Sequence, residues 1–161
     1  MTPYHQLVSD YARLLKQGRT FPLGTFKAAP RPKIPANAPK ALIFSPHPDD
    51  ECLVGGVALR LMRQAHMNVT NIAVTLGSNK ERQPGRLREL QDACNYIGFN
   101  LLPAAPSGLE KVNLKTREHD PKHWAASVKA IKDIIAQYQP KVVYARTTMT
   151  GTARISGRIT W

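Results

Sequence analysis

The chain has 161 residues, 42% of them apolar, which predicts a single globular domain with its own core. No run of 18 apolar residues occurs, and the first residues lack the basic and apolar regions of a signal peptide, so we expect neither a membrane span nor secretion. The net charge of +12 divides into +6 in residues 1–40, +3 in 41–145 and +3 in 146–161, so the excess lies at the two ends and argues against a nucleic-acid-binding body.

The first predicted element is an amphipathic helix over residues 4–17, ended by Gly18. Its apolar residues recur at i, i+3, i+4 and i+7, as on one face of a helix; they are Tyr4, Leu7, Val8, Tyr11, Leu14 and Leu15. A connector with five prolines follows as far as residue 39 and should be extended. We therefore divide the chain into an N-terminal segment, 1–39, a core domain, 40–145, and an atypical tail, 146–161.

From residue 40 onward, strand patterns alternate with helix patterns. A short apolar run, typical of a strand buried on both faces, is found at 41–45. Further strands are predicted at 69–76, 99–102 and 141–145. Helical periodicity is found at 52–66, 85–97 and about 120–138, whereas 103–119 is predicted to be a loop. This alternation predicts an α/β layered domain with a mainly parallel sheet.

The two cysteines, Cys52 and Cys94, lie singly within predicted helices. Isolated thiols are typical of a reduced cytoplasmic protein rather than of a disulfide framework. We therefore expect a cytoplasmic location. The sequence contains no signal for the oligomeric state.

Residues 45–51, Ser-Pro-His-Pro-Asp-Asp-Glu, directly follow the first predicted strand. Ligands of open parallel sheets bind at the carboxyl ends of strands, so this segment is a candidate site. An imidazole and a carboxylate, here His47 and Asp50, suit a zinc ion. Asp49 could then accept a proton from the metal-bound water. A divalent cation would also make this cluster of carboxylates favourable.

A structural alternative exists for the same acids. Asp49, Asp50 and Glu51 could be the N-cap and first-turn residues of the following helix, where carboxylates face the positive end of the helix dipole. The preceding Pro-His-Pro at a strand end favours a metal site over this alternative.

The segment 44–51 and the residues after it resemble the opening signature of the PIG-L/LmbE-like deacetylase family. The similarity covers roughly residues 40–145, and it rests on Phe44–Glu51, Leu53, Gly55, Gly56, Val74–Gly77, Arg86–Leu90, Ala93 and Gly98. The resemblance implies a Rossmann-like fold and a zinc-dependent hydrolase that removes an acetyl group from an N-acetylglucosamine-type conjugate or a related amide. The implied substrate is a small molecule or a glycoconjugate.

The same resemblance implies roles for individual residues. His47 and Asp50 would be zinc ligands, and Asp49 would be the general base. Arg86 and Glu89 resemble a pair on the substrate side of the family's site. An exposed helix-surface pair at i, i+3 is an equally good interpretation of these two residues.

The chain departs from the family at the third zinc ligand. The family places a histidine after a later strand, here the strand at 141–145, but residues 146–161 contain no His, Asp or Glu. His119 and His123 flank a predicted helix start, and His5 and His66 lie in or at the end of helices, so we expect all four to be surface residues. With two ligands only, zinc would be held weakly and the chain would have little or no activity, and a C-terminally truncated sheet would leave an edge uncovered.

We interpret residues 146–161 as the product of a shifted reading frame. Read one base earlier, every Thr codon (ACN) becomes NAC and every Ile codon (ATH) becomes NAT, and both encode only His, Asp, Asn or Tyr. One permitted solution reads PHDNDWNSTHIGTHHL, the type of loop that the family has at this place. Any tail rich in Thr and Ile gives such residues when shifted, so the encoding DNA decides the question.

Three functions therefore compete. The first is a zinc-dependent N-deacetylase, and the second is another metal-dependent hydrolase with the same cluster. The third is a catalytically dead α/β module whose basic ends bind an anionic partner.

Overall fold

The computed structural model describes residues 2–20 and 26–145, apart from the side chains of residues 52–54. Within this part of the chain the body is a four-stranded sheet with the order β3-β2-β1-β4, and every pair of neighbours is parallel. The strands are β1 (Lys40–Ser45), β2 (Asn68–Ala73), β3 (Asn100–Pro103) and β4 (Val142–Ala145). The prediction of an α/β domain with a parallel sheet is confirmed.

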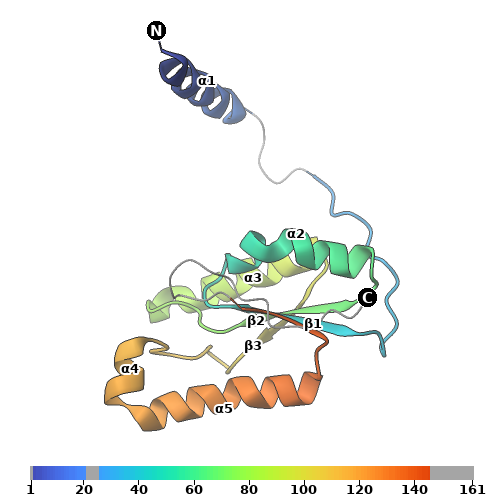
Figure 1. The fold of residues 1–161 in the computed structure, drawn as a ribbon, viewed down its shortest axis with the longest axis vertical. Helices are drawn as coiled ribbons and strands as arrows, with labels where there is room; N and C mark the ends of the chain where they lie inside the picture. Colours follow the sequence, from blue (N-terminus) through green and yellow to red (C-terminus); the bar gives the residue numbers. More distant parts are fainter. Residues whose placement is uncertain (1, 21–25, 146–161) are drawn as a thin grey trace.

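Helices cover both faces of the sheet. Helices α2 (Asp50–Arg63) and α3 (Gln83–Ile97) lie on one face, and α4 (Leu114–His119) and α5 (Pro121–Tyr138) lie on the other (Figure 1). A short 3₁₀ helix, η1 (Lys80–Arg82), leads into α3. The fold thus has the three layers of an open α/β domain.

Alternate residues of β1 supply the cores of the two layers. Ala41 and Ile43 belong to the cluster that includes α2 and α3, whereas Leu42 and Phe44 pack in the cluster that includes Ile134 of α5. All four are at most 8% exposed. The strand is therefore buried on both faces, which explains its continuous apolar sequence.

The direction of the strand order changes at β1. The chain first steps outward from β1 to β2 and β3, and then α5 carries it back across the sheet to β4 on the other side of β1. Phe44 consequently pairs with Ile72 of β2 and with Ala145 of β4. A crevice forms outside the carboxyl ends of strands at such a switch point, and this is where open α/β sheets bind ligands.

Several element boundaries differ from the predicted ones. Helix α2 begins at Asp50 rather than at residue 52, and it ends at Arg63 rather than at His66, which has a φ of 51°. β2 ends at Ala73 instead of residue 76. The predicted loop at 103–119 contains α4, whose first turn is capped by the Asn113 side chain accepting from the Thr116 amide at 2.9 Å.

The N-terminal helix α1 (Pro3–Gly18) forms as predicted, one residue longer at each end, and none of its residues is buried. The connector after it is fixed to the body from Arg31 onward. The Arg31 Nε donates to the Gly98 carbonyl at 2.7 Å, and Asn68 Nδ2 donates to the Pro35 carbonyl at 3.0 Å. In the described part of the chain, no helix has the length and apolar character needed to cross a membrane. The division at residue 39 stays a prediction, and the tail 146–161 lies outside the described residues.

Candidate active site

His47 and Asp50 lie together in the loop between β1 and α2. The His47 amide donates to Asp50 Oδ2 at 2.9 Å, and His47 Nδ1 is 3.5 Å from the same oxygen. The histidine side chain is 61% exposed, whereas that of Asp50 is 7% exposed. The arrangement follows from the local sequence, because β1 ends two residues before His47 and α2 starts at Asp50. The structure thus brings the two predicted zinc ligands to one point at the switch crevice.

Asp49 connects them in a left-handed backbone conformation, with φ 109° and ψ −21°. A non-glycine residue in such a region costs about 1–3 kcal/mol and is typically found at functional sites. Its amide donates to Glu51 Oε2 at 3.0 Å, and Glu51 is 2% exposed. Asp49 takes the N-cap position of α2, but its exposed side chain makes no capping hydrogen bond. The interpretation of Asp49 as a helix N-cap thus accounts for its position before α2. It does not account for the carboxylate, which makes no capping hydrogen bond.

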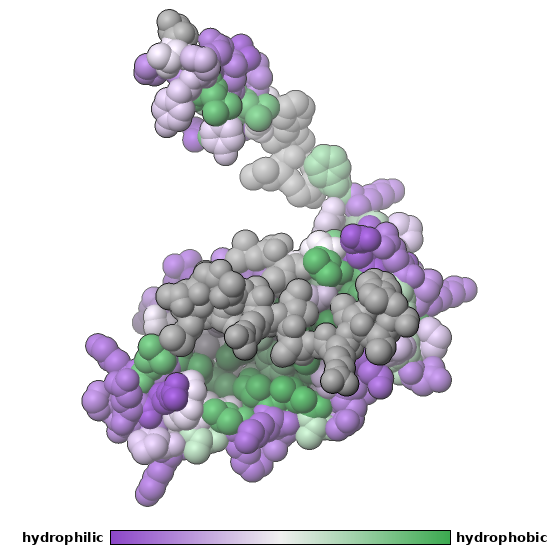
Figure 2. Space-filling view, viewed as in Figure 1, coloured by the Kyte–Doolittle hydropathy of each residue, from purple (hydrophilic) through white to green (hydrophobic). Residues whose placement is uncertain are grey.

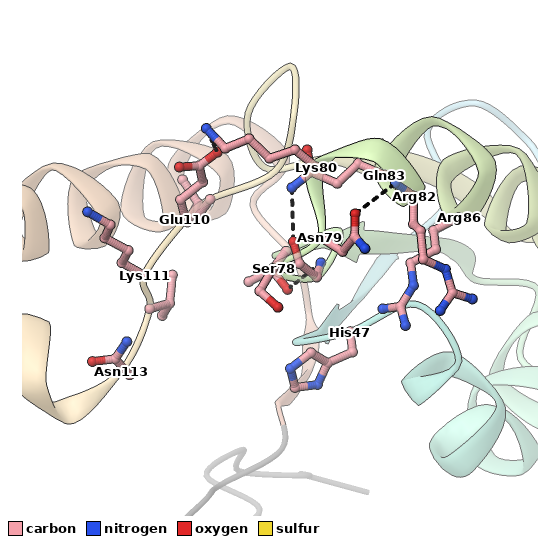
Figure 3. Close-up of a pocket in the computed structure, with 14 residues that line it drawn as sticks. His47, Ser78, Asn79, Lys80, Arg82, Gln83, Arg86, Glu110, Lys111 and Asn113 are labelled. Atoms are coloured by element: carbon pink, nitrogen blue, oxygen red, sulfur yellow. Dashed lines mark hydrogen bonds and ion pairs between the residues drawn. The ribbon is translucent and has the colours of Figure 1, made fainter.

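A cleft of ≈ 610 Å³ opens beside His47. Its walls are the segments that follow β1, β2 and β3, together with the start of α3, so that His47 lines it together with residues such as Ser78, Arg82 and Arg86 (Figure 3). Thr75 Oγ1 donates to the Pro46 carbonyl at 2.6 Å and ties the first two of these segments together. The cleft therefore sits at the carboxyl ends of the strands, as a ligand site of this fold should.

The walls of the cleft are polar and mainly basic. Lys80, Arg82, Arg86 and Lys111 line it, and Glu110 is the one carboxylate among the described residues that do. Lys80 Nζ is 3.3 Å from Glu110 Oε1, which joins the segment after β2 to the segment after β3. Such walls suit a ligand with hydroxyl groups or with negative charge. Lys80, Glu110 and Lys111 were not predicted as site residues, although each follows a predicted strand.

Arg86 and Glu89 occupy different environments on α3. Arg86 is half-buried in the cleft wall, where its guanidinium lies against Gly77. Gln83 fixes the same turn, because its Nε2 donates to the Gly77 carbonyl at 2.9 Å. Glu89 is exposed and is not one of the described residues that line the cleft. The structure brings Arg86, but not Glu89, to the cleft that His47 faces.

The other histidines do not gather with His47. His5, His66 and His119 are exposed, as expected. His123 is half-buried instead, and its Nε2 lies 2.8 Å from the Glu110 carbonyl oxygen. The expectation of a surface residue was wrong for His123, because it ties the first turn of α5 to the loop after β3.

The donor set fits a zinc ion in part. An imidazole nitrogen and a carboxylate oxygen that already share one point are two ligands of a kind that zinc accepts. Residues 2–20 and 26–145, without the side chains of 52–54, bring together no group of three His, Cys, Asp or Glu. The expected third ligand follows Ala145, which pairs with Phe44 just before the His47 loop and lies at the limit of the described residues.

Comparisons with known proteins give a family and several solved structures to which this chain is similar. The model of the PIG-L family, described as GlcNAc-PI de-N-acetylase, matches residues 42–152. A conserved protein from Thermus thermophilus is similar in structure, with 21% identity and a TM-score of 0.40 over 66% of this chain and 46% of that one. A deacetylase of teicoplanin biosynthesis, solved with teicoplanin, has 19% identity and a TM-score of 0.42 over 65% of this chain and 56% of its own. The chain thus spans about half the length of these solved structures. No curated protein sequence matches it.

Proposed function

The chain belongs to the PIG-L (GlcNAc-PI de-N-acetylase) family, and from this premise we propose that it is a zinc-dependent hydrolase that removes an N-acetyl group from an N-acetylglucosamine-type conjugate or a related amide. The observation that carries the proposal is the proximity of His47 and Asp50 beside the basic cleft, where His47 Nδ1 is 3.5 Å from Asp50 Oδ2. A paired imidazole and carboxylate at a switch crevice is what a metal-assisted amide hydrolysis requires of its first two ligands.

His47 and Asp50 would hold the cation, which when bound would polarise the amide carbonyl and make the attacking water more acidic. Asp50 also fixes the loop, because it accepts the His47 amide hydrogen while facing the imidazole. Asp49 is exposed beside these two residues and makes no capping bond with its side chain, so it can accept the proton of the water and pass it to the departing amine.

The substrate would lie in the cleft of ≈ 610 Å³, with its amide toward His47. Arg86, Lys80 and Lys111 would bind the hydroxyl groups or an anionic group of the conjugate, since they line the cleft from three different segments. Glu89 lies outside the cleft wall, and its exposed position fits the alternative of a helix-surface residue.

A second candidate is an inactive α/β module that binds an anionic partner. It is favoured by one observation, namely that the described residues gather no group of three metal ligands. The two candidates differ in zinc content and in acetate release, which makes them separable in one experiment.

The test compares the chain with its His47→Ala variant after purification in the presence of zinc. We expect bound zinc in the unchanged chain and its loss in the variant, with acetate released from N-acetylglucosamine conjugates only by the former. His119→Ala is a matched control, because His119 is exposed on α4. Equal zinc content in the chain and in His47→Ala would refute the site, and zinc binding without acetate release from any acetylated sugar would refute the reaction.

A further inference from the structure

Helix α1 exposes a continuous apolar face. Each of its large apolar residues is between 51% and 71% exposed, and these residues are Tyr4, Leu7, Val8, Tyr11, Leu14 and Leu15. Their spacing places all of them within one stripe of the helix surface. The space-filling view shows apolar side chains exposed on α1 among hydrophilic ones (Figure 2). A stripe of this size on an amphipathic helix normally packs against something.

The helix is specified by its own sequence rather than by packing. Thr2 is the N-cap and accepts from the His5 amide, and Pro3 occupies the first turn. Asp10, at the edge of the apolar stripe, accepts hydrogen bonds from Gln6 at 3.2 Å and from Arg13 at 2.8 Å. With 16 residues the helix is about 24 Å long. It therefore presents a defined apolar face although none of its residues is buried.

The charge around this face is mainly positive. Residues 11–48 contain seven Lys and Arg and no Asp or Glu. Arg13 and Lys16 lie on the polar side of α1, and Arg19 and Lys27 follow it closely. The one acid of α1, Asp10, is already paired with Arg13.

We propose that α1 is an interfacial helix that docks on the surface of an anionic lipid bilayer. A bilayer satisfies both features at once, because the acyl chains receive the apolar stripe and the headgroups receive the basic residues. Nucleic acid would use the charge but not the stripe, and a second copy of the chain would bring two basic segments together. The two tyrosines suit the interface between water and lipid, where amphipathic rings are favoured.

The attachment of α1 leaves the cleft accessible. The connector is fixed at Arg31 and Pro35, which contact residues just before β3 and at the start of β2, at the amino ends of these strands. The cleft lies at the carboxyl ends. The 12 residues between α1 and Arg31 can span at most about 40 Å. Binding through α1 would thus hold the body near the membrane without occupying the cleft.

The test is flotation of the full chain with vesicles of phosphatidylcholine, with and without phosphatidylglycerol. We expect binding to the anionic vesicles that weakens as salt is raised. Leu7→Glu combined with Leu14→Glu should weaken binding by about tenfold or more, because it places two charges in the apolar stripe. Gln6→Glu combined with Ser9→Glu is the matched control, since it adds the same charge on the opposite side of α1 and should retain most of the binding. All three chains should unfold at the same temperature, because α1 buries nothing.

Three results would overturn the proposal. The first is equal binding to neutral and anionic vesicles, or to neither. The second is an equal loss of binding in the two double variants, which would leave the apolar stripe without a role. The third is a dimer in solution that the Leu7→Glu and Leu14→Glu changes dissociate, which would assign the stripe to a second copy.

Discussion

The Arg86 guanidinium lies so close to Gly77 that a β-carbon at position 77 would be 2.7 Å from Arg86 Nη1. Gly77 also has a φ of 86°, which side chains rarely adopt. Two structural features therefore favour glycine at position 77, after β2. One is the turn itself, and the other is the space that the cleft-lining arginine needs.

Gly77→Ala should affect both stability and substrate binding. The left-handed backbone would cost about 1–2 kcal/mol of unfolding free energy, and the guanidinium would be pushed from its place. We expect a higher KM with a smaller change in kcat, measured with an acetylated sugar conjugate, and a lower midpoint in urea unfolding.

Gly85→Ala is the control for this change, because a β-carbon there meets nothing within 4 Å. It lies within α3 and should stabilise the chain by up to about 1 kcal/mol without altering KM. An unchanged KM in Gly77→Ala would show that Arg86 does not depend on this contact for substrate binding.

Substitutions of Asp49 should change catalytic activity and stability in different ways. Asp49→Asn keeps the shape of the side chain, and Asn tolerates the observed φ of 109°. If Asp49 accepts the proton, kcat should fall by about 10²–10⁴ while zinc content stays constant. Asp49→Gly should lose the same activity yet unfold at a higher denaturant concentration, because the backbone strain of about 1–3 kcal/mol is relieved. Full activity in Asp49→Asn would exclude this residue as the base.

A buried hydrogen bond between β1 and β2 should contribute to the stability of the chain. Ser45 Oγ donates to Asn71 Oδ1 at 2.7 Å, and Asn71 Nδ2 donates to Cys94 Sγ at 3.7 Å. Both Ser45 and Asn71 are 0% exposed. Asn71→Ala leaves the serine hydroxyl without its acceptor and should cost about 1–3 kcal/mol in urea unfolding. Adding Ser45→Ala to this variant should recover part of the loss; a further additive loss would contradict the pairing.

β1 and β2 were predictable because their apolar runs are buried on both faces, and Asp120 and Pro121 marked the start of α5 correctly. The start of α2 could not be predicted, because it depends on the unusual φ of Asp49, and the periodicity of the sequence does not reveal that φ. Lys80 and Lys111 were missed for a different reason. They meet only through the strand order β3-β2-β1-β4, and a single sequence does not state that order.

The distinct environments of Arg86 and Glu89 are a second case in which the sequence alone does not place a residue at the site. Both lie on α3, three residues apart, and the sequence leaves open whether they form a substrate-side pair or a helix-surface pair. Which of the two faces the cleft depends on the rotation of α3 against the sheet, and Leu90 and Cys94 fix that rotation through burial. Candidate residues on a helix can therefore be assigned to a site only after the packing of the helix is known.

The interpretation of residues 146–161 as a shifted reading frame leads to a last prediction. Because β4 pairs with β1, the chain leaves Ala145 next to the loop that carries His47. The written residues 146–161 offer no His, Asp, Glu or Cys, whereas the permitted solution given above has a histidine two residues after Ala145. We expect the encoding DNA to show the shift, and the chain with the restored frame to bind zinc at least about tenfold more tightly, since zinc sites of enzymes have three protein ligands. His47→Ala should abolish that gain. An intact frame with a stop codon directly after Trp161 would contradict the interpretation, and so would a restored chain whose zinc affinity is unchanged.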